Sequence, residues 1–271
     1  MAHKKISHDS RAIVTGAGSG IGRGFALELA KRNAQVVCSD INLVAAEETV
    51  ALIEAKGGKA LAVQCDVAQL AEVESLAKTA EQWFGVPNLV VNNAGVGVGG
   101  YPIGEVSIED WKWTLDINLW GVIHGCHVFV PKLKGQKNAG IINVSSAASF
   151  GSAPLMGPYS ASKAAVLSIT ETLYAELAGT DVHVTALCPT YLNTRILENS
   201  RTPAKTSELA RKLMAMSGLE PAREARDTLK ARDRNQLYDM PQIDAKLGWR
   251  MKRMLPTFFH RSASWIDRFA N

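Results

Sequence analysis

The chain has 271 residues, of which 46% are apolar and 21% charged, and its formal net charge is +4. This length suits one large α/β domain with a substantial core. The four cysteines lie far apart without a C-x-x-C spacing, which argues against a disulfide framework or a zinc site. We therefore expect no bound metal. No apolar stretch reaches the roughly 18 residues that span a bilayer, so we expect a soluble, cytoplasmic protein.

The charge is divided unevenly along the chain. Residues 1–194 carry 14 basic and 17 acidic side chains, a net charge of −3, whereas residues 195–271 carry 16 and 9, a net charge of +7. Such an asymmetry can mark a nucleic-acid or membrane surface, but no RNA-binding or recognition-helix motif accompanies it. We therefore expect no nucleic-acid partner and interpret the basic residues as a solvated helix face.

Short β-branched runs alternate with longer amphipathic segments from residue 11 to about residue 188, the spacing of repeated β-α units. Strands are predicted at Arg11–Thr15, Gln35–Ser39, Ala60–Gln64, Leu89–Asn92, Gly140–Ser145 and Val182–Cys188. Helical patterns begin near Gly20, Leu43, Gln69, Glu109 and Gly157. This order predicts an α/β fold with a doubly wound, Rossmann-like parallel sheet, whose ligand lies beyond the carboxyl ends of the strands.

The pattern turns helical from residue 195, with one weak strand candidate at Gln236–Met240. No internal repeat or linker divides the sequence, so we expect a single catalytic domain over residues 1–271. Its last part, residues 241–271, is predicted to be a helical extension rich in aromatic and basic side chains.

The first predicted strand runs directly into a glycine-rich turn that opens the first helix. The turn reads Gly16-Ala17-Gly18-Ser19-Gly20-Ile21-Gly22. Glycine backbone at a helix start lets a pyrophosphate approach the free N–H groups and the positive helix end. Because tight packing of a helix on a strand can require the same glycines, the turn indicates a dinucleotide site only together with other signals.

Asp40 follows the second predicted strand, 18 residues after Gly22. A carboxylate there can accept hydrogen bonds from both adenosine ribose hydroxyls and repels a 2′-phosphate. No basic residue stands at Ser19 or Ile41 to neutralise that phosphate. These positions predict NAD in preference to NADP; the alternative for Asp40 is a helix cap before Asn42.

Three motifs resemble those of the short-chain dehydrogenase/reductase family, in its order and at its spacing. They are Thr15-Gly16-x-x-x-Gly20-x-Gly22, Asn92-Asn93-Ala94-Gly95 and Tyr159-x-x-x-Lys163, within a similarity that covers roughly residues 8 to 195. The resemblance implies hydride transfer between NAD(H) and a secondary alcohol or ketone. It also implies cofactor binding by Gly16, Ser19, Gly20, Ile21, Gly22, Asp40, Ile41, Asp66, Val67, Asn93, Ala94, Gly95, Tyr159, Lys163, Pro189, Thr190, Leu192 and Thr194. The Asn-Asn-Ala-Gly run can also serve only to end a strand in a turn.

Tyr159 and Lys163 are four residues apart on a predicted helix, so their side chains share one face. An ammonium near a phenol favours the phenolate, which a free tyrosine with a pKa of about 10 rarely forms at neutral pH. The resemblance makes Tyr159 the catalytic acid/base and gives Lys163 the nicotinamide ribose as a further ligand. The resemblance also implies that Asn118 binds a water molecule that relays protons. The alternative is that Asn118 is a polar residue whose hydrogen bonds are all formed inside the helix.

Two adjacent serines end the strand that precedes this helix. Alternation along a strand puts Ser145 and Ser146 on opposite faces, so only one of them can contact the substrate oxygen. The resemblance selects Ser146, which lies 13 residues before Tyr159, and leaves Ser145 a structural role.

The resemblance weakens after the strand Val182–Cys188. Thr190 stands where the family has a glycine, and the family's closing strand with its Asp-Gly-Gly end is missing beyond residue 218. The Met- and Leu-rich segment 195–218 takes the place of the family's substrate lid. The tail at 241–271 can touch anionic lipid, cover an apolar substrate cavity or pack on a partner subunit, and lipid contact is the least favoured of the three.

We therefore predict an NAD-dependent short-chain alcohol dehydrogenase or ketone reductase for a small, mostly apolar secondary alcohol or ketone. A 3-ketoacyl-type reductase is a close alternative, although Asp40 argues against its usual NADPH. An NAD-binding redox sensor without turnover is the alternative from another class, and the complete catalytic set argues against it. The family dimerises through long helices such as those predicted at Glu109–Leu133 and Gly157–Ala178, which implies a homodimer or homotetramer.

Overall fold

The computed structural model describes residues 7–190, 192, 196, 200–216 and 220–262. Its seven strands form one parallel sheet in the order β3-β2-β1-β4-β5-β6-β7. They span Arg11–Thr15 (β1), Gln35–Asp40 (β2), Lys59–Gln64 (β3), Leu89–Asn92 (β4), Ala139–Val144 (β5), Val182–Leu187 (β6) and Tyr238–Asp239 (β7). The strand order reverses between β1 and β4, which confirms the predicted doubly wound sheet.

The helices follow the strands in alternation, as predicted. They are α1 (Gly20–Ala30), α2 (Leu43–Glu54), α3 (Leu70–Phe84), α4 (Ile108–Leu115), α5 (Gly121–Lys134), α6 (Ala148–Gly151), α7 (Gly157–Glu176), α8 (Ala204–Met216), α9 (Pro221–Asp233) and α10 (Ile243–Met254). A 3-10 turn, η1, covers Ile103–Glu105, and residues 256–262 are helical again after α10. Within the described ranges, every helix is too short or too polar to cross a bilayer.

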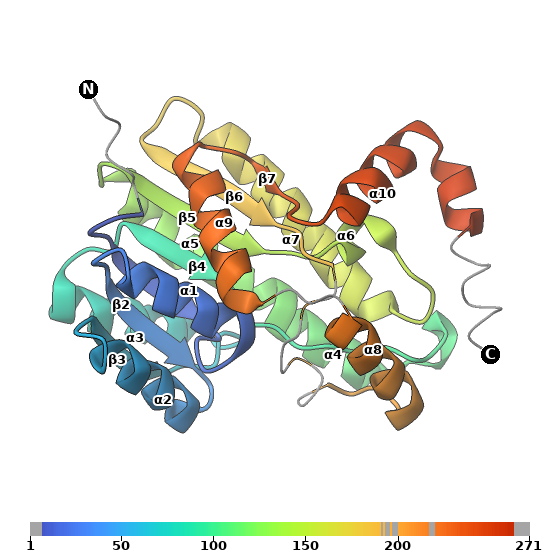
Figure 1. Cartoon of the computed structure of the whole chain (residues 1–271), viewed down its shortest axis with the longest axis horizontal. Coiled ribbons are helices and arrows are strands. Elements are labelled where there is room, and N and C mark those ends of the chain that lie inside the picture. The colour runs from blue at the N-terminus through green and yellow to red at the C-terminus, as the bar shows by residue number, and fades with distance from the viewer. Residues whose placement is uncertain (1–6, 191, 193–195, 197–199, 217–219, 263–271) are drawn as a thin grey trace.

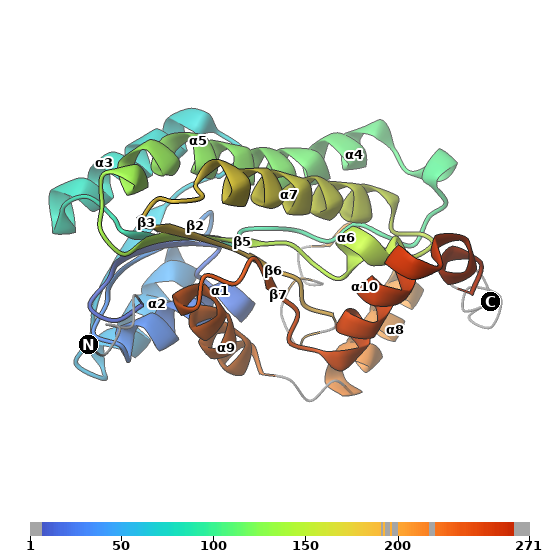
Figure 2. The same ribbon diagram turned by 90° about the horizontal axis from the view of Figure 1, so that it is seen from above.

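The helices cover both faces of the sheet (Figures 1 and 2). Figure 2 shows α3, α4, α5 and α7 on one face and α1, α2 and α9 on the other, while α8 and α10 lie beyond the carboxyl ends of the strands. Each face has its own apolar core: Phe25 and Leu29 of α1 pack on one side, and Phe129 and Leu133 of α5 on the other. Because both faces are buried, the strands are almost uniformly apolar, as parallel strands between two helix layers require.

The long helix predicted from Glu109 is interrupted in the middle. A single π-helical segment, η2 (Asp116–Trp120), separates α4 from α5 and contains the fully buried Asn118. Such an extra residue in a helix turns one side chain out of its regular position, and it occurs frequently at functional sites.

The weak strand candidate predicted after residue 218 is confirmed, although the Asp-Gly-Gly end of the family's closing strand is missing there. Tyr238 and Asp239 form β7 and pair in parallel with Ala186 and Leu187 of β6. The strand lies inside the weak candidate Gln236–Met240. Because only two residues pair, the segment lacks the four to eight alternating residues from which a strand is normally predicted.

Arg232 of α9 is fully buried against this half of the sheet. Its Nη2 donates to the carbonyl oxygen of Asn138 at 3.1 Å, and its Nη1 lies 3.5 Å from Oδ1 of Asp233. Burial lowers the pKa of its guanidinium to about 10. The guanidinium packs directly on Gly140 of β5, where a Cβ atom would collide with Nε. The glycine therefore makes room for a buried cation that cannot move without losing its partners.

Replacing Gly140 by alanine tests this packing. We expect Gly140→Ala to lower the free energy of unfolding by about 2 kcal/mol, because an overpacked core must displace the guanidinium. The measurement is chemical denaturation followed by circular dichroism. Gly104→Ala is the matched control, since nothing lies within 4 Å of the Cβ it adds. Equal stability of the two variants would contradict the role given to Gly140.

Candidate active site

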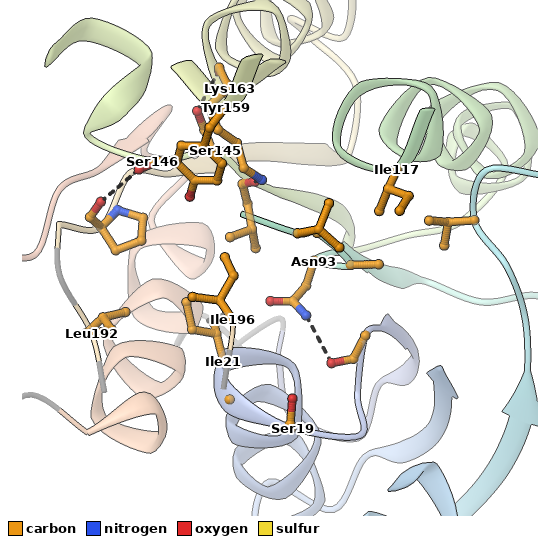
Figure 3. A pocket seen from close by; sticks show the side chains of 18 of the residues that line it. Ser19, Ile21, Asn93, Ile117, Ser145, Ser146, Tyr159, Lys163, Leu192 and Ile196 are labelled. Atoms are coloured by element: carbon orange, nitrogen blue, oxygen red, sulfur yellow. Dashed lines mark hydrogen bonds between the residues drawn. The ribbon is translucent and has the colours of Figure 1, made fainter. Parts of the chain in front are cut away.

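A pocket opens beyond the carboxyl ends of the strands, at the point where the strand order reverses (Figure 3). Figure 3 shows Ser19 and Ile21 toward one end and Ser146, Tyr159 and Lys163 at the other. The lining residues are Gly16, Ser19, Gly20, Ile21, Asp40, Ile41, Cys65, Asp66, Val67, Asn93, Ala94, Gly95, Val96, Ile117, Val144, Ser145, Ser146, Tyr159, Lys163, Pro189, Thr190, Leu192, Ile196 and Met214.

The pocket brings together most of the residues singled out from the sequence. Among the 18 positions implied to bind the cofactor, Gly22 does not line it and Thr194 lies outside the described residues. Of the four proposed catalytic residues, Asn118 is buried behind the lining. The sequence analysis gave no site role to the lining residues Cys65, Val96, Ile117 and Val144, whereas Ile196 and Met214 belong to the predicted lid segment 195–218.

The glycine-rich turn forms the floor at one end of the pocket. Gly16 has a φ of +64°, a conformation that favours glycine, and its carbonyl oxygen accepts a hydrogen bond from Nδ2 of Asn93 at 3.2 Å. A Cβ on Gly22 would collide with that carbonyl, so Gly22 acts by close packing. Ser19, at the N-cap of α1, makes no side-chain cap bond, and the first turn of α1 contains no acidic residue. The positive end of α1 therefore faces the pocket uncapped.

Asp40 lies at the edge of the pocket with its carboxylate fixed by the backbone. Its Oδ2 accepts from the N–H of Gly18 at 2.9 Å, and its Oδ1 accepts from the N–H of Asn42 at 3.0 Å. The nearby guanidinium of Arg23 pairs with Glu48 at 2.9 Å and does not line the pocket. The carboxylate thus supports the glycine turn and the start of α2, and it also contributes negative charge to the pocket edge.

The next strand adds a thiol to this end of the pocket. Cys65 directly follows β3 and is buried, and its burial raises the pKa of the thiol to about 12. The group is therefore neutral and unreactive. Beside it, Asp66 and Val67 also line the pocket.

Lys163 lies at the opposite end and is almost fully buried in α7. Its Nζ donates to the carbonyl oxygen of Val144 at 2.9 Å and lies 5.9 Å from the centre of the Tyr159 ring. Burial lowers the pKa of the ammonium to about 8. The helix thus places the phenol of Tyr159 and an ammonium group with a lowered pKa together at the pocket wall.

Asn118 supports this end from behind. Its Oδ1 accepts from the N–H of Val96 at 2.7 Å, while its Nδ2 donates to the carbonyl oxygen of Val96 at 2.9 Å and to Oγ of Ser162 at 3.2 Å. A Cβ on Gly95 would lie 3.0 Å from Oδ1 of Asn118 and 3.4 Å from Nζ of Lys163. The amide therefore fixes the loop after β4 against α7, directly beside the lysine.

The two serines after β5 have different partners. Oγ of Ser145 donates to the carbonyl oxygen of Lys163 at 2.9 Å. Oγ of Ser146 accepts from the N–H of Ala148 at 3.1 Å and lies 3.5 Å from the carbonyl oxygen of Pro189, a long donor contact. Both serines line the pocket, but the hydroxyl of Ser145 is engaged in holding α7, which leaves Ser146 the better placed to bind a substrate oxygen.

The loop after β6 is held by a residue that the sequence analysis missed. The N–H of Thr190 donates to Oε1 of Gln242 at 3.2 Å, and Nε2 of Gln242 lies 3.5 Å from Oε1 of Glu224. Gln242 precedes α10, so the C-terminal extension reaches the pocket through a single buried amide. No local pattern marks this glutamine, because its partners are 52 and 18 residues away.

Glu224 is a buried carboxyl group on α9. Its burial and the nearby carboxylates of Asp239 and Asp227 raise its pKa to about 7, against the opposing effects of Gln242 and Arg223. The group that holds Gln242 therefore changes its charge near neutral pH.

Comparisons with known proteins agree with this geometry. Residues 10–205 match the family model described as short chain dehydrogenase. A probable oxidoreductase, EphD, from Mycobacterium tuberculosis is 39% identical over 190 residues, which are 70% of this chain and 32% of EphD. The chain thus spans about a third of the length of that relative.

Two further relatives match most of their own length. A 3-oxoacyl-[acyl-carrier-protein] reductase from Synechocystis is 40% identical over 190 residues, or 69% of this chain and 76% of the relative. A cyclohexanol dehydrogenase from Acinetobacter is 35% identical over 186 residues, or 69% of this chain and 74% of the relative. A short-chain dehydrogenase/reductase from Burkholderia phymatum, solved in complex with NAD, has a TM-score of 0.82 and 35% identity and covers 90% of this chain and 92% of its own.

The titration of Glu224 predicts how stability depends on pH. The folded state binds the proton up to about pH 7, whereas an unfolded glutamate releases it near its ordinary pKa of 4.5. Stability therefore falls as pH rises from about 4.5 to about 7, by on the order of 2 kcal/mol, and this loss is complete above pH 7. Urea denaturation at several pH values should show that Glu224→Gln removes the fall, while the exposed-site control Glu54→Gln keeps it. A fall of the same size in the Glu224→Gln variant would contradict the assignment.

Proposed function

Because the chain belongs to the short-chain dehydrogenase/reductase family, we propose that it transfers a hydride between NAD(H) and a mostly apolar secondary alcohol or ketone. One observation carries the proposal: a single pocket has an uncapped helix start and Asp40 at one end, and Ser146, Tyr159 and Lys163 at the other. A dinucleotide is long enough to need both ends.

The residues at the glycine end fit a dinucleotide cofactor. The uncapped start of α1 offers backbone N–H groups and a positive helix end to a pyrophosphate, and the glycine turn leaves room for its close approach. Asp66 and Val67 would flank the adenine, while Asn93, Ala94 and Gly95 would line the adenosine ribose and the centre of the sheet. Pro189, Thr190 and Leu192 would meet the nicotinamide end.

Asp40 supports NAD over NADP. Its carboxylate lines the pocket edge and is fixed by two backbone N–H groups, so it cannot swing away from a 2′-phosphate without losing them. Arg23, the nearby cation, pairs with Glu48 and does not line the pocket. A ribose with two free hydroxyls can donate to the carboxylate, whereas a 2′-phosphate meets repulsion.

The catalytic roles follow from the other end of the pocket. When bound, the nicotinamide accepts the hydride from the carbinol carbon or returns it to the carbonyl carbon. In the oxidation, the phenolate of Tyr159 takes the hydroxyl proton while Ser146 donates a hydrogen bond to the same oxygen. The ammonium of Lys163 stabilises the phenolate, and Asn118 positions the loop beside that ammonium. In the reduction, Tyr159 gives the proton back.

The substrate class is inferred from the apolar side chains of the pocket. Val96, Leu192, Ile196 and Met214 line it, and Lys163 is the single cation among its described lining residues. A mostly apolar alcohol or ketone fits such walls, and the cyclohexanol dehydrogenase relative has a substrate of this kind. Of the segment 195–218 predicted as the substrate lid, residues 196 and 200–216 are described, and Ile196 and Met214 among them line the pocket, which supports the lid role. The reductase relative from Synechocystis favours a ketoacyl substrate as the second candidate, and activity assays with ketoacyl compounds would reveal it.

We also propose a homodimer formed through α5 and α7. The support is the family's habit of pairing these two helices, together with the exposed side chain of Trp120 beside α5, which is 49% exposed. A stable protein interface commonly buries aromatic side chains of this kind.

Removing the phenolic oxygen tests the acid/base assignment. We expect Tyr159→Phe to lower kcat about 10³-fold, because proton transfer from a positioned group contributes on that scale. NADH affinity, measured by nicotinamide fluorescence, should stay within about threefold. Tyr174→Phe removes a hydroxyl from the same helix outside the pocket and should keep full activity. Unchanged turnover in the Tyr159→Phe variant would refute the mechanism, and NADH binding without turnover in the unmodified protein would favour the sensor alternative.

Removing the charge of Asp40 tests the cofactor assignment. We expect the unmodified protein to prefer NAD⁺, and Asp40→Asn to shift the ratio of kcat/KM values toward NADP⁺ by about 10- to 100-fold, since it removes the repulsion and retains an acceptor oxygen for Gly18. Asp66→Asn removes the other carboxylate of the pocket and should leave the ratio unchanged. A preference for NADP⁺ in the unmodified protein would show that the ribose site has been misassigned.

A further inference from the structure

Helix α10 and the helical residues after it expose an apolar stripe. Six large apolar side chains between residues 243 and 258 are more than a third exposed. We define the C-terminal stripe as these six residues: Ile243 (73% exposed), Leu247 (59%), Met251 (38%), Met254 (78%), Leu255 (56%) and Phe258 (61%). On α10 they are spaced by three or four residues, so they share one face of the helix.

The opposite face of α10 anchors it to the body of the protein. Ala245 and Trp249 pack with Phe150 and Leu167 in a small core of their own, and the ring of Tyr238 lies 5.6 Å from that of Trp249. Phe259 folds back onto Gly248, which ties residues 256–262 to α10. The segment is therefore a docked helical unit, which Figures 1 and 2 show at the edge of the molecule. Its stripe residues are exposed and do not line the pocket.

Cations line one edge of the C-terminal stripe. Lys246, Arg250 and Arg253 are all exposed and follow one another at helical spacing next to the apolar face. Within the described part of the chain, Lys246 and Arg250 form no ion pair, and Arg253 lies over the ring of Trp249 at 3.9 Å. Asp244 is the single acidic residue between positions 243 and 262, against five cations.

An anionic bilayer matches this combination better than the alternatives do. The stripe does not cover the pocket, because its residues are exposed and absent from the pocket lining. Two copies paired antiparallel through their stripes would bring both cationic edges to the same side, where they repel each other. An anionic membrane offers acyl chains to the apolar side chains of the stripe and negatively charged headgroups to the cations along its edge.

We propose that α10 and residues 256–262 form a docking surface for an anionic phospholipid membrane. The charge division of the chain gives the contact a direction, because the body, residues 1–194, carries −3 and is repelled, whereas residues 195–271 carry +7. The stripe then lies at the boundary between headgroups and acyl chains, with Lys246 and Arg250 among the headgroups, while Arg253 stays over the ring of Trp249. This inference stands apart from the proposed function, since it needs neither the cofactor nor turnover.

The test is cosedimentation of the full chain with phospholipid vesicles at low and at high salt. We expect binding to vesicles that contain phosphatidylglycerol, no binding to pure phosphatidylcholine, and release at high salt. Lys246→Gln combined with Arg250→Gln should weaken the binding about 30-fold, and Leu247→Gln combined with Met254→Gln more than about tenfold. All four residues are exposed, so circular dichroism should show unchanged folding.

Matched controls come from α2 and the residues between it and the start of β3. Lys56→Gln with Lys59→Gln removes two exposed cations, and Val44→Gln with Leu52→Gln removes two exposed apolar side chains, so both double variants should bind as the unmodified protein does. Absence of binding at low salt, or equal binding to neutral vesicles, would overturn the proposal. Analytical ultracentrifugation without lipid measures the oligomeric state of the same variants. If a stripe variant breaks up an oligomer, the stripe binds a second copy of the chain, and the membrane proposal is overturned.

Discussion

The burial of one ammonium group governs the architecture of the catalytic end. Lys163 lies inside the protein with its Nζ 2.9 Å from the carbonyl oxygen of Val144, and burial lowers its pKa to about 8. A buried cation is tolerated only where fixed dipoles replace water. Its position is therefore set by the end of β5, the first turns of α7 and the loop after β4, all of which must keep their places for the group to remain charged.

The surrounding contacts meet this requirement from three sides. Ser145 holds the backbone of Lys163 itself, Asn118 fixes the loop at Val96, and Gly95 leaves the gap that a side chain would close. The π segment in the helix exists at the point where Asn118 must turn toward that loop. The irregular turn of the helix thus lets the amide of Asn118 bind the backbone of Val96, 22 residues earlier in the chain.

The sequence predicted the sheet well because its signals are local. The six longer strands are mostly apolar, and each was placed within a residue or so at either end. The glycine turn and the Tyr159-x-x-x-Lys163 pair need only neighbouring positions to be recognised. The features that were predicted weakly or missed depend on contacts between distant residues. The strand β7 pairs only two residues and was predicted only as a weak candidate, and the missed link from Thr190 through Gln242 to Glu224 joins three separate segments. Neither leaves a periodic pattern in the sequence.

The region that departs most from the family resemblance is also the region that acts on the pocket from outside. Thr190 replaces a glycine, and its N–H is bound by Gln242, so the loop beside Ser146 is held by the same segment that begins α10. Any force that shifts α10, such as insertion of its exposed face into a bilayer, would reach this loop through the hydrogen bond from Thr190 to Gln242 and through the small core that Ala245 shares with Cys188. Because Glu224 titrates near neutral pH on the other side of Gln242, the strength of that link depends on pH as well. A C-terminal extension anchored in this way can couple the surroundings of the protein to its pocket without any residue of α10 lining it.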